Sequence, residues 1–123
     1  MIHKTILIVE DNLDTRLLYR KALEMEDYQV VLVGSGHEAI EQLKTANLPS
    51  LILLDLTLPE MSGAEFLELV RSNSEWAAIK VVIVSGWDNL KTKAKEIGAD
   101  GCIRKPFELS RLYEEVEKYL PVS

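Results

Sequence analysis

Four polar groups that lie far apart in the chain carry side chains suited to phosphoryl chemistry. Asp55 follows the apolar run 51–54, and each of the other three groups follows a strand-like segment; they are Glu10-Asp11, Ser85-Gly86 and Lys105-Pro106. Three carboxylates held close together repel one another unless a cation lies among them, and Mg²⁺ prefers oxygen ligands of this kind. A lysine and a hydroxyl can hold a phosphoryl oxygen. The set therefore predicts Mg²⁺-assisted phosphoryl chemistry on Asp55.

The chain between these groups alternates between strand-like and helical patterns. The strand-like segments are 5–9, 29–33, 51–54, 80–84 and 101–104. Between and after them, apolar residues recur at helical spacing; they are Leu17, Leu18, Ala22 and Met25, then Ala39, Ile40 and Leu43, then Phe66, Leu67 and Val70, then Leu90, Ala94 and Ile97, and finally Leu109, Leu112, Val116 and Tyr119. We expect the second helix to end near Asn47 and the fourth at Gly98.

This alternation predicts an α/β fold, a doubly wound parallel sheet of five strands with five helices on its two faces. Ligands of such sheets bind at the carboxyl ends of the strands. The four polar groups follow the first, third, fourth and fifth strands, so they converge at this edge if those strands are neighbours.

The composition is that of one soluble globular domain. Of the 123 residues, 47% are hydrophobic and 28% charged, and the formal net charge of −6 argues against nonspecific binding to nucleic acid. The apolar runs are far shorter than the ~18 residues of a membrane helix, and no signal-peptide pattern opens the chain, so we expect a cytoplasmic protein without membrane insertion. Cys102 is the single cysteine, which excludes an intrachain disulfide and a cysteine zinc site. We expect residues 1–123 to form one domain, without an output domain.

Taken together, the polar groups resemble the receiver domain of two-component response regulators over essentially the whole chain. The matching segments are Glu10-Asp11, the aspartate in LLDLTLPEMSG, Ser85-Gly86 and Lys105-Pro106-Phe107. Each segment is weak by itself, but four in this order at these separations make a specific signal. The resemblance implies a flavodoxin-like sheet with the strand order 2-1-3-4-5, as in a stand-alone chemotaxis receiver.

The resemblance also implies which residues accept the phosphoryl group and hold the metal. A histidine kinase or histidine phosphotransfer protein would supply the phosphoryl group, and Asp55 would accept it. Glu10, Asp11, Asp55 and the backbone carbonyl of Thr57 would bind Mg²⁺, which neutralises charge on the phosphoryl oxygens.

Further residues would respond to the phosphoryl group. Lys105 would pair with it, and Pro106 would aim the lysine through a cis peptide. Ser85 would move to hydrogen-bond it, and Gly86 would leave room for this movement. Because a phosphoryl group adds about −1.5 to −2 charges, it can shift the balance between two packings. Binding of an unidentified downstream protein would then change on the surface of the fourth helix, fifth strand and fifth helix.

Three residues modify the family pattern. Cys102 stands where many receivers have tyrosine or phenylalanine, so an aromatic side chain cannot transmit the signal from that position. Glu10 replaces the commoner aspartate, and metal binding should survive the extra methylene. Trp87 follows Ser85 by two residues, at a position that in the family influences phosphoryl hydrolysis, and we expect its indole to shield the aspartyl phosphate from water.

Simpler interpretations exist for each group taken alone. The acids near residue 10 could cap the first helix, and Asp55 could cap a loop. The Ser85-Gly86 pair could make a turn, and Lys105 could be a solvated lysine. A basic patch on the predicted fourth helix is either a solvated face or a docking site for an acidic partner; it consists of Lys91, Lys93 and Lys95.

Two functions of different classes follow from the sequence. The first is a phosphorylation-driven switch, a monomer or weak dimer that catalyses only its own phosphorylation and dephosphorylation. The second is a docking module with the receiver fold that works without phosphorylation. Such a module would not need the four polar groups and could have lost any of them, yet all four are present. A phosphatase with an aspartyl nucleophile would need a second acid where Thr57 stands, and a flavin site would need a phosphate-cradling loop after the first strand. The sequence therefore favours the switch.

Overall fold

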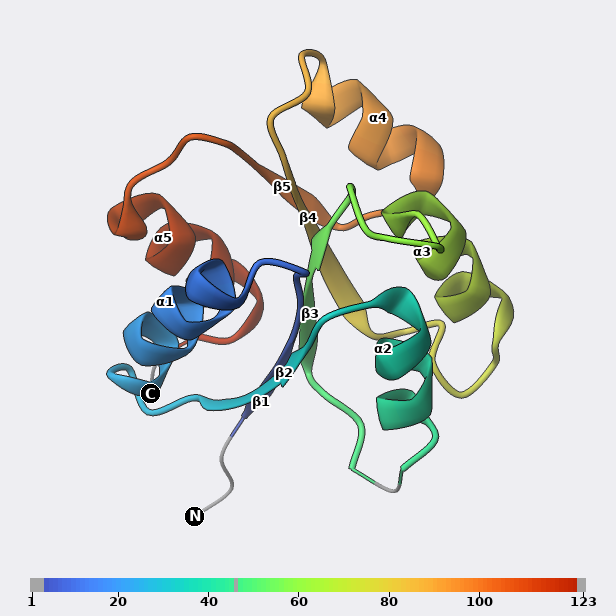
Figure 1. Cartoon of the computed structure of the whole chain (residues 1–123), viewed down its shortest axis with the longest axis horizontal. Helices are drawn as coiled ribbons and strands as arrows, with labels where there is room; N and C mark the ends of the chain where they lie inside the picture. Colours follow the sequence, from blue (N-terminus) through green and yellow to red (C-terminus); the bar gives the residue numbers. More distant parts are fainter. Residues whose placement is uncertain (1–3, 46, 122–123) are drawn as a thin grey trace.

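Five parallel strands form one sheet in the order β2-β1-β3-β4-β5 in the computed structural model, which describes residues 4–45 and 47–121. The strands are β1 (Thr5–Val9), β2 (Gln29–Val33), β3 (Leu51–Asp55), β4 (Lys80–Ser85) and β5 (Gly101–Arg104). The helices are α1 (Leu13–Glu24), α2 (Gly36–Leu43), α3 (Gly63–Ser72), α4 (Leu90–Ile97) and α5 (Leu109–Tyr119). Helices α1 and α5 cover one face of the sheet, and α2, α3 and α4 cover the other (Figure 1). The predicted fold and strand order are confirmed.

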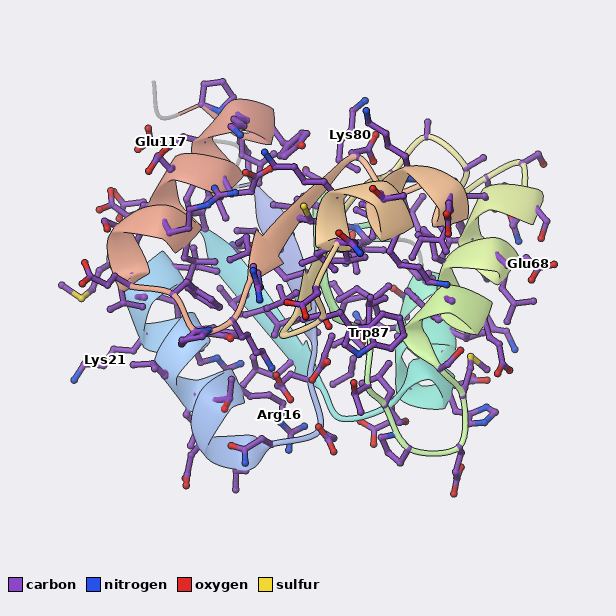
Figure 2. All side chains as sticks on the ribbon, turned by 90° about the horizontal axis from the view of Figure 1, so that it is seen from above. Arg16, Lys21, Glu68, Lys80, Trp87 and Glu117 are labelled. Carbon is purple, nitrogen blue, oxygen red and sulfur yellow. The ribbon has the colours of Figure 1, made fainter. Side chains whose placement is uncertain are left out.

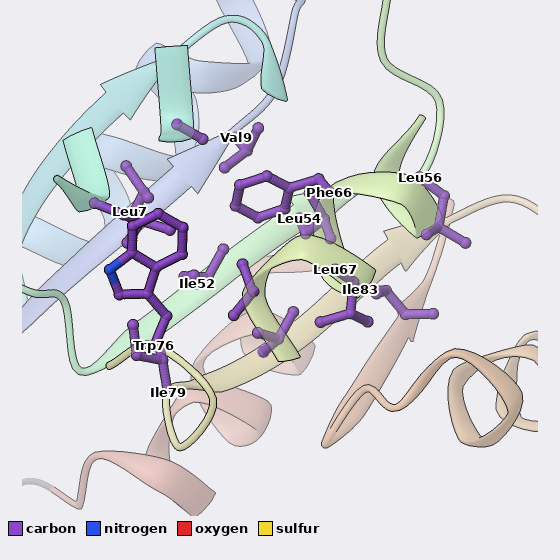
Figure 3. Packing of buried hydrophobic residues seen from close by; sticks show 14 of the residues in the cluster. Leu7, Val9, Ile52, Leu54, Leu56, Phe66, Leu67, Trp76, Ile79 and Ile83 are labelled. Atoms are coloured by element: carbon purple, nitrogen blue, oxygen red, sulfur yellow. The ribbon is translucent and has the colours of Figure 1, made fainter. Parts of the chain in front are cut away.

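The sheet is apolar on both faces because helices cover both. The central strand β3 is buried along its whole length. Successive side chains of a strand point to opposite faces, so Leu7 and Val9 pack toward α2 and α3, whereas Ile6 and Ile8 pack toward α1 and α5. Figure 3 shows the first of these clusters, to which Trp76 contributes its indole. Removal of this apolar surface from water is the main contribution to the stability of the sheet.

Helix α1 buries a different stripe from the one that Leu17 and Leu18 suggest. Of the four apolar residues that predicted this helix, Ala22 is buried, whereas Leu17, Leu18 and Met25 are exposed. The buried residues of α1 are Tyr19, Ala22 and Leu23. Both sets of residues fit helical spacing, so spacing predicts the helix but does not choose the face that packs on the sheet.

Most helix ends follow their sequence signals. Asn12, Ser35 and Ser62 cap α1, α2 and α3 by accepting a hydrogen bond from an N–H three residues later. Gly98 ends α4, as predicted, with a φ of 84° that suits glycine. The longest described helix, α1, has 12 residues, and none of the described helices is long and apolar enough to cross a membrane.

Helix α2 ends earlier than predicted. Its last residue is Leu43, whereas the sequence suggested an end near Asn47. The N–H and the hydroxyl of Thr45 both donate to the carbonyl of Gln42. These short-range bonds satisfy a carbonyl of the last turn and end the helix there.

Arg71 of α3 ties together the amino ends of β4 and β5, at the edge of the sheet opposite to the carboxyl ends. Its guanidinium donates to the Asp100 carboxylate at 2.8 Å, and that carboxylate also accepts the N–H of Val81. The same guanidinium donates to three carbonyls, those of Ala77, Ile79 and Gly98. A planar guanidinium suits this arrangement because its donors point in fixed directions.

We expect Arg71→Ala to lower the free energy of unfolding by about 2–3 kcal/mol, because it removes the guanidinium donor of three carbonyls and one of the donors of the Asp100 carboxylate. Chemical denaturation measures this change. Lys44→Ala is the matched control, since it removes an exposed pair with Glu41 and should cost less than about 0.5 kcal/mol. Equal losses in the two variants would contradict the assigned role of Arg71.

Candidate functional site

The four predicted polar groups meet at the carboxyl edge of the sheet. Asp55 is the last residue of β3 and Ser85 the last of β4, while Glu10 and Lys105 directly follow β1 and β5. Strand pairing makes β1, β3, β4 and β5 consecutive neighbours in the sheet. The topology therefore gathers residues that lie far apart in the sequence.

Glu10, Asp11 and Asp55 form an acid cluster. One carboxylate oxygen from each residue lies within 4.8 Å of the other two. Glu10 and Asp55 are buried, whereas Asp11 is exposed. Backbone groups fix the two buried side chains, because the N–H of Asn12 donates to Glu10 at 3.2 Å and the N–H of Thr57 donates to Asp55 at 2.9 Å. The acid cluster thus combines two fixed, desolvated carboxylates with one that faces water.

Lys105 brings a positive charge to the acid cluster. Its Nζ lies 3.4 Å from Oε1 of Glu10 and 3.6 Å from Oδ2 of Asp55. Its N–H donates to the carbonyl of Ser85 at 2.8 Å, which ties the start of the β5–α5 loop to the end of β4. The peptide bond between Lys105 and Pro106 is cis. One ammonium is thus shared by two of the three carboxylates of the acid cluster.

Burial raises the pKa of Glu10 from 4.5 to about 7. The hydrogen bond from Asn12 and the charge of Lys105 lower this pKa, whereas the charge of Asp55 raises it. At pH 7 about half of the Glu10 side chains therefore carry a proton, which a bound cation would displace. The donor set fits Mg²⁺, which binds carboxylate oxygens and keeps several waters, because the acid cluster supplies oxygen ligands and one exposed side.

Four other predicted site residues differ in burial and in what they contact; they are Ser85, Gly86, Trp87 and Cys102. Ser85 is buried, and its hydroxyl accepts the N–H of Trp87 at 3.2 Å. A Cβ added to Gly86 would meet only the carbonyl of Lys105, at 3.9 Å, so the space beside it is open. Trp87 is 49% exposed. Cys102 is half-buried within β5 and packs against the apolar cluster under α2, α3 and α4, rather than with the acids.

Helix capping explains Asn12 but not the neighbouring acids. The side chain of Asn12 accepts the N–H of Thr15 at 2.9 Å and begins α1. Glu10 instead contributes to the acid cluster. Asp55 accepts the N–H two residues later, as a loop cap does, yet the same carboxylate belongs to the acid cluster. Asp55 therefore caps the loop after β3 and also belongs to the acid cluster.

Tyr19 is a buried phenol that feels the charge of the acid cluster and that the sequence did not predict. Burial raises the pKa of Tyr19, and the charges of Glu10 and Asp55 raise it further. Its ring centroid lies 5.9 Å from that of Phe107. Both rings line a groove of about 800 Å³ together with Lys105. The signal that could have revealed this phenol is the helical spacing of positions 19, 22 and 23.

The chain is similar to known proteins over nearly its whole length. Residues 6–117 match the family model of the response regulator receiver domain. Sporulation initiation phosphotransferase F of Bacillus subtilis (strain 168) is 33% identical over 124 residues, which cover 99% of this chain and 98% of that protein. The polar-differentiation response regulator DivK of Brucella ovis is 34% identical over 120 residues, covering 95% and 96%. Among solved structures, the chemotaxis response regulator CheY4 of Vibrio cholerae has 25% identity and a TM-score of 0.88, covering 96% and 99%.

We expect the metal-free protein to become less stable as the pH rises from 4.5 to about 7. Glu10 has a pKa of about 7 when folded and an ordinary value of 4.5, so the folded state binds this proton more tightly than the unfolded state. The free energy of unfolding should therefore fall between the two values and stay low above them, by about 2–3 kcal/mol in total. Urea unfolding in the presence of a chelator, at about pH 5 and about pH 8, measures the loss.

Glu10→Gln should remove most of this pH dependence, because glutamine does not titrate. Glu41→Gln is the matched control, since Glu41 is exposed and its substitution should leave the pH dependence unchanged. A Glu10→Gln protein that loses as much stability as the wild type would show that other groups cause the loss.

Proposed function

Because the chain belongs to the response regulator receiver domain family, we propose that it is a phosphorylation-driven signalling switch in which Asp55 accepts the phosphoryl group. The observation that carries this proposal is the environment of the Asp55 carboxylate. It is buried, it accepts the N–H of Thr57 at 2.9 Å, and it lies 3.6 Å from the ammonium of Lys105. A carboxylate positioned by fixed neighbours is suited to in-line attack on phosphorus.

The phosphoryl donor would be a phosphohistidine on a histidine kinase or a histidine phosphotransfer protein. A carboxylate oxygen of Asp55 forms a bond to phosphorus while the bond between phosphorus and the donor's histidine nitrogen breaks. The histidine keeps the electron pair of the broken bond, so no oxidant or reductant is needed. Lys105 pairs with the phosphoryl oxygens and offsets their charge.

Mg²⁺ is the proposed cofactor, held by Glu10, Asp11, Asp55 and the backbone carbonyl of Thr57. Receiver domains bind Mg²⁺ in an acidic pocket, and the acid cluster of this chain offers three carboxylate oxygens within 4.8 Å of one another. When bound, the ion neutralises charge that develops on the phosphoryl oxygens. The raised pKa of Glu10 supports this assignment, because it reflects burial of the carboxylate first and the nearby charge of Asp55 second, and a bound cation would offset both.

Ser85 and Gly86 would pass the change from Asp55 to the surface. The hydroxyl of Ser85 accepts the N–H of Trp87, which leaves the hydroxyl proton for a phosphoryl oxygen. Gly86 keeps open space beside the carbonyl of Lys105, so the loop can move. Cys102 offers no aromatic ring, so the signal reaches the surface of α4, β5 and α5 by movement of the loop.

The switch would act through noncovalent protein partners as one domain, residues 1–123, in the cytoplasm. The donor would be the kinase or phosphotransfer protein, and a downstream protein would recognise the changed surface. One relative is named for phosphotransfer, and another is named a response regulator. A net charge of −6 supports protein partners rather than direct contact with nucleic acid. We propose a monomer or weak dimer.

Acetyl phosphate with Mg²⁺ should add one phosphoryl group to the wild-type protein, detected by intact mass. Asp55→Asn should abolish the addition because the amide cannot form the acyl phosphate. Asp14→Asn is the matched control, since it removes one exposed carboxylate of α1 and should be phosphorylated like the wild type. Chelation of Mg²⁺ should slow the reaction strongly. Absence of phosphorylation in the wild type would favour the docking module that works without it.

Trp87→Ala should shorten the lifetime of the phosphorylated protein. The indole lies in the loop that starts at Ser85, and its loss would open the approach of water to phosphorus. The decay of the phosphorylated mass after removal of acetyl phosphate measures the lifetime. Trp87→Phe keeps a ring and should lie between the wild type and the alanine variant. Equal lifetimes in all three proteins would rule out shielding by this side chain.

A further inference from the structure

The buried ring of Tyr19 in α1 contacts the loop that follows Lys105. Its centroid lies 5.9 Å from that of the Phe107 ring, and the two ring planes are inclined by 30°, a separation within the ~4.5–7 Å range of attractive aromatic pairs. We call Tyr19 and Phe107 the aromatic pair. Figure 2 shows α1 and α5 side by side, and the aromatic pair belongs to the apolar cluster between these helices and the sheet. The contact therefore ties the β5–α5 loop to α1.

The ring of Tyr19, and not its hydroxyl, makes this contact. The other three tyrosines each donate their hydroxyl to a backbone carbonyl. Within residues 4–45 and 47–121, no such bond joins the Tyr19 hydroxyl to the protein, although the residue is buried. Packing of the ring is thus the interaction that Tyr19 contributes.

Among the described residues, few other interactions hold the loop between Lys105 and α5. Lys105 donates its N–H to the carbonyl of Ser85 at 2.8 Å. Pro106 has no N–H to donate, and the side chain of Glu108 makes no capping hydrogen bond to α5. Pro106 and Glu108 are both exposed, whereas Phe107 is half-buried. The ring of Phe107 is therefore the side chain that anchors this loop to the rest of the protein.

The same loop carries the ammonium that two buried carboxylates share. The Nζ of Lys105 lies 3.4 Å from Oε1 of Glu10 and 3.6 Å from Oδ2 of Asp55. The Lys105 side chain is 36% exposed, so its position depends on the backbone of the loop more than on packing around it. Helix α1 thus reaches the site twice, since the N–H of Asn12 before it binds Glu10 and the aromatic pair holds the loop of Lys105.

We propose that Tyr19 is a positioning residue, which holds Lys105 beside Asp55 through the ring of Phe107 and so speeds transfer of the phosphoryl group to Asp55. This inference rests on the proposed function. In the transfer, an Asp55 oxygen bonds to phosphorus while the bond from phosphorus to the donor breaks, and the donor keeps the electron pair. A cation assists this step only if it is already in place when charge develops on the phosphoryl oxygens, so a looser loop slows the transfer.

Four substitutions separate this ring contact from the general packing of α1 on α5. Tyr19→Leu and Phe107→Leu, the two pair variants, each remove one ring; the second changes a half-buried residue and serves if the first does not fold. Tyr19→Phe keeps the ring and removes only the hydroxyl. Tyr113→Leu is the matched control, because the Tyr113 hydroxyl also joins α5 to α1, by donating to the carbonyl of Ala22 at 3.1 Å, but Tyr113 does not line the groove that contains Lys105.

The first measurement is hydrogen exchange at the Lys105 amide, without any phosphodonor. This N–H is bonded to the carbonyl of Ser85 only while the loop keeps its place. The amide of Leu56, which donates to the carbonyl of Val84, is the internal reference for a general loss of stability. Relative to this reference, we expect exchange about two- to tenfold faster in the two pair variants, the factor that an aromatic pair supports, and unchanged exchange in the other two variants.

The second measurement compares the rate of phosphorylation by acetyl phosphate with the affinity for Mg²⁺. We expect the two pair variants to be phosphorylated about two- to tenfold more slowly, and Tyr19→Phe and Tyr113→Leu to match the wild type. The affinity for Mg²⁺, measured by calorimetry without phosphodonor, should not fall in any variant, because backbone N–H groups outside the loop fix Glu10 and Asp55. A general disturbance of the site would lower both quantities together.

Three results would overturn this inference alone. They are a normal rate in both pair variants, an equal loss of rate in Tyr113→Leu, and a loss in Tyr19→Phe as large as that in Tyr19→Leu. A wild-type protein that accepts no phosphoryl group would instead refute the proposed function, whereas hydrogen exchange at Lys105 tests the anchoring of the loop in either case.

Discussion

Crowded negative charge at the carboxyl ends of β1 and β3 is the constraint on which the rest of the structure depends. Glu10 and Asp55 are both buried, and burial of an ionised carboxylate is costly unless hydrogen bonds and opposite charge compensate for it. Backbone N–H groups bind each carboxylate, and Lys105 reaches both of them. The compensation is partial, because the pKa of Glu10 remains raised to about 7. This residual cost of burying negative charge is one that a bound cation, as proposed above, would offset.

The apolar sheet makes this arrangement possible, because it fixes the strand ends that carry the charged groups. The fully buried β3 lies between β1 and β4, and β5 pairs with β4. Lys105 follows β5, which does not pair with β3, and yet its side chain reaches Asp55 at the end of β3. At the opposite edge, Arg71 ties the amino ends of β4 and β5 to α3. The backbone pairing of β1 with β3 keeps the mutually repelling acids close.

Much of this could be predicted from the sequence, and the failures have physical causes. The strand pattern and the residues that follow each strand predicted which groups meet, because topology alone brings them to one edge. Helical spacing does not indicate which face of α1 is buried. The prediction of this helix therefore used Leu17 and Leu18, which are exposed, and did not include Tyr19, which is buried. The cation–π contact between the Trp87 ring and Lys93 of α4 depends on the path of the β4–α4 loop, including the positive φ of Asn89, which no pattern of apolar residues encodes.

The two sides of the expected output surface differ in how firmly they are held. Burial raises the pKa of Glu115, but hydrogen bonds from Arg111 and Lys118 outweigh it, so this pKa lies below its ordinary value and the buried carboxylate stays charged. Arg111 also donates to the carbonyl of Cys102, and this network fixes α5 to β5.

Helix α4, in contrast, begins at Asn89 without a side-chain cap and presents lysines that form no ion pairs within the described chain. A segment with fewer stabilising interactions opens at lower free energy. If Asp55 is phosphorylated as we propose, these differences favour movement of the β4–α4 loop and α4, because the Glu115 network holds α5 against β5.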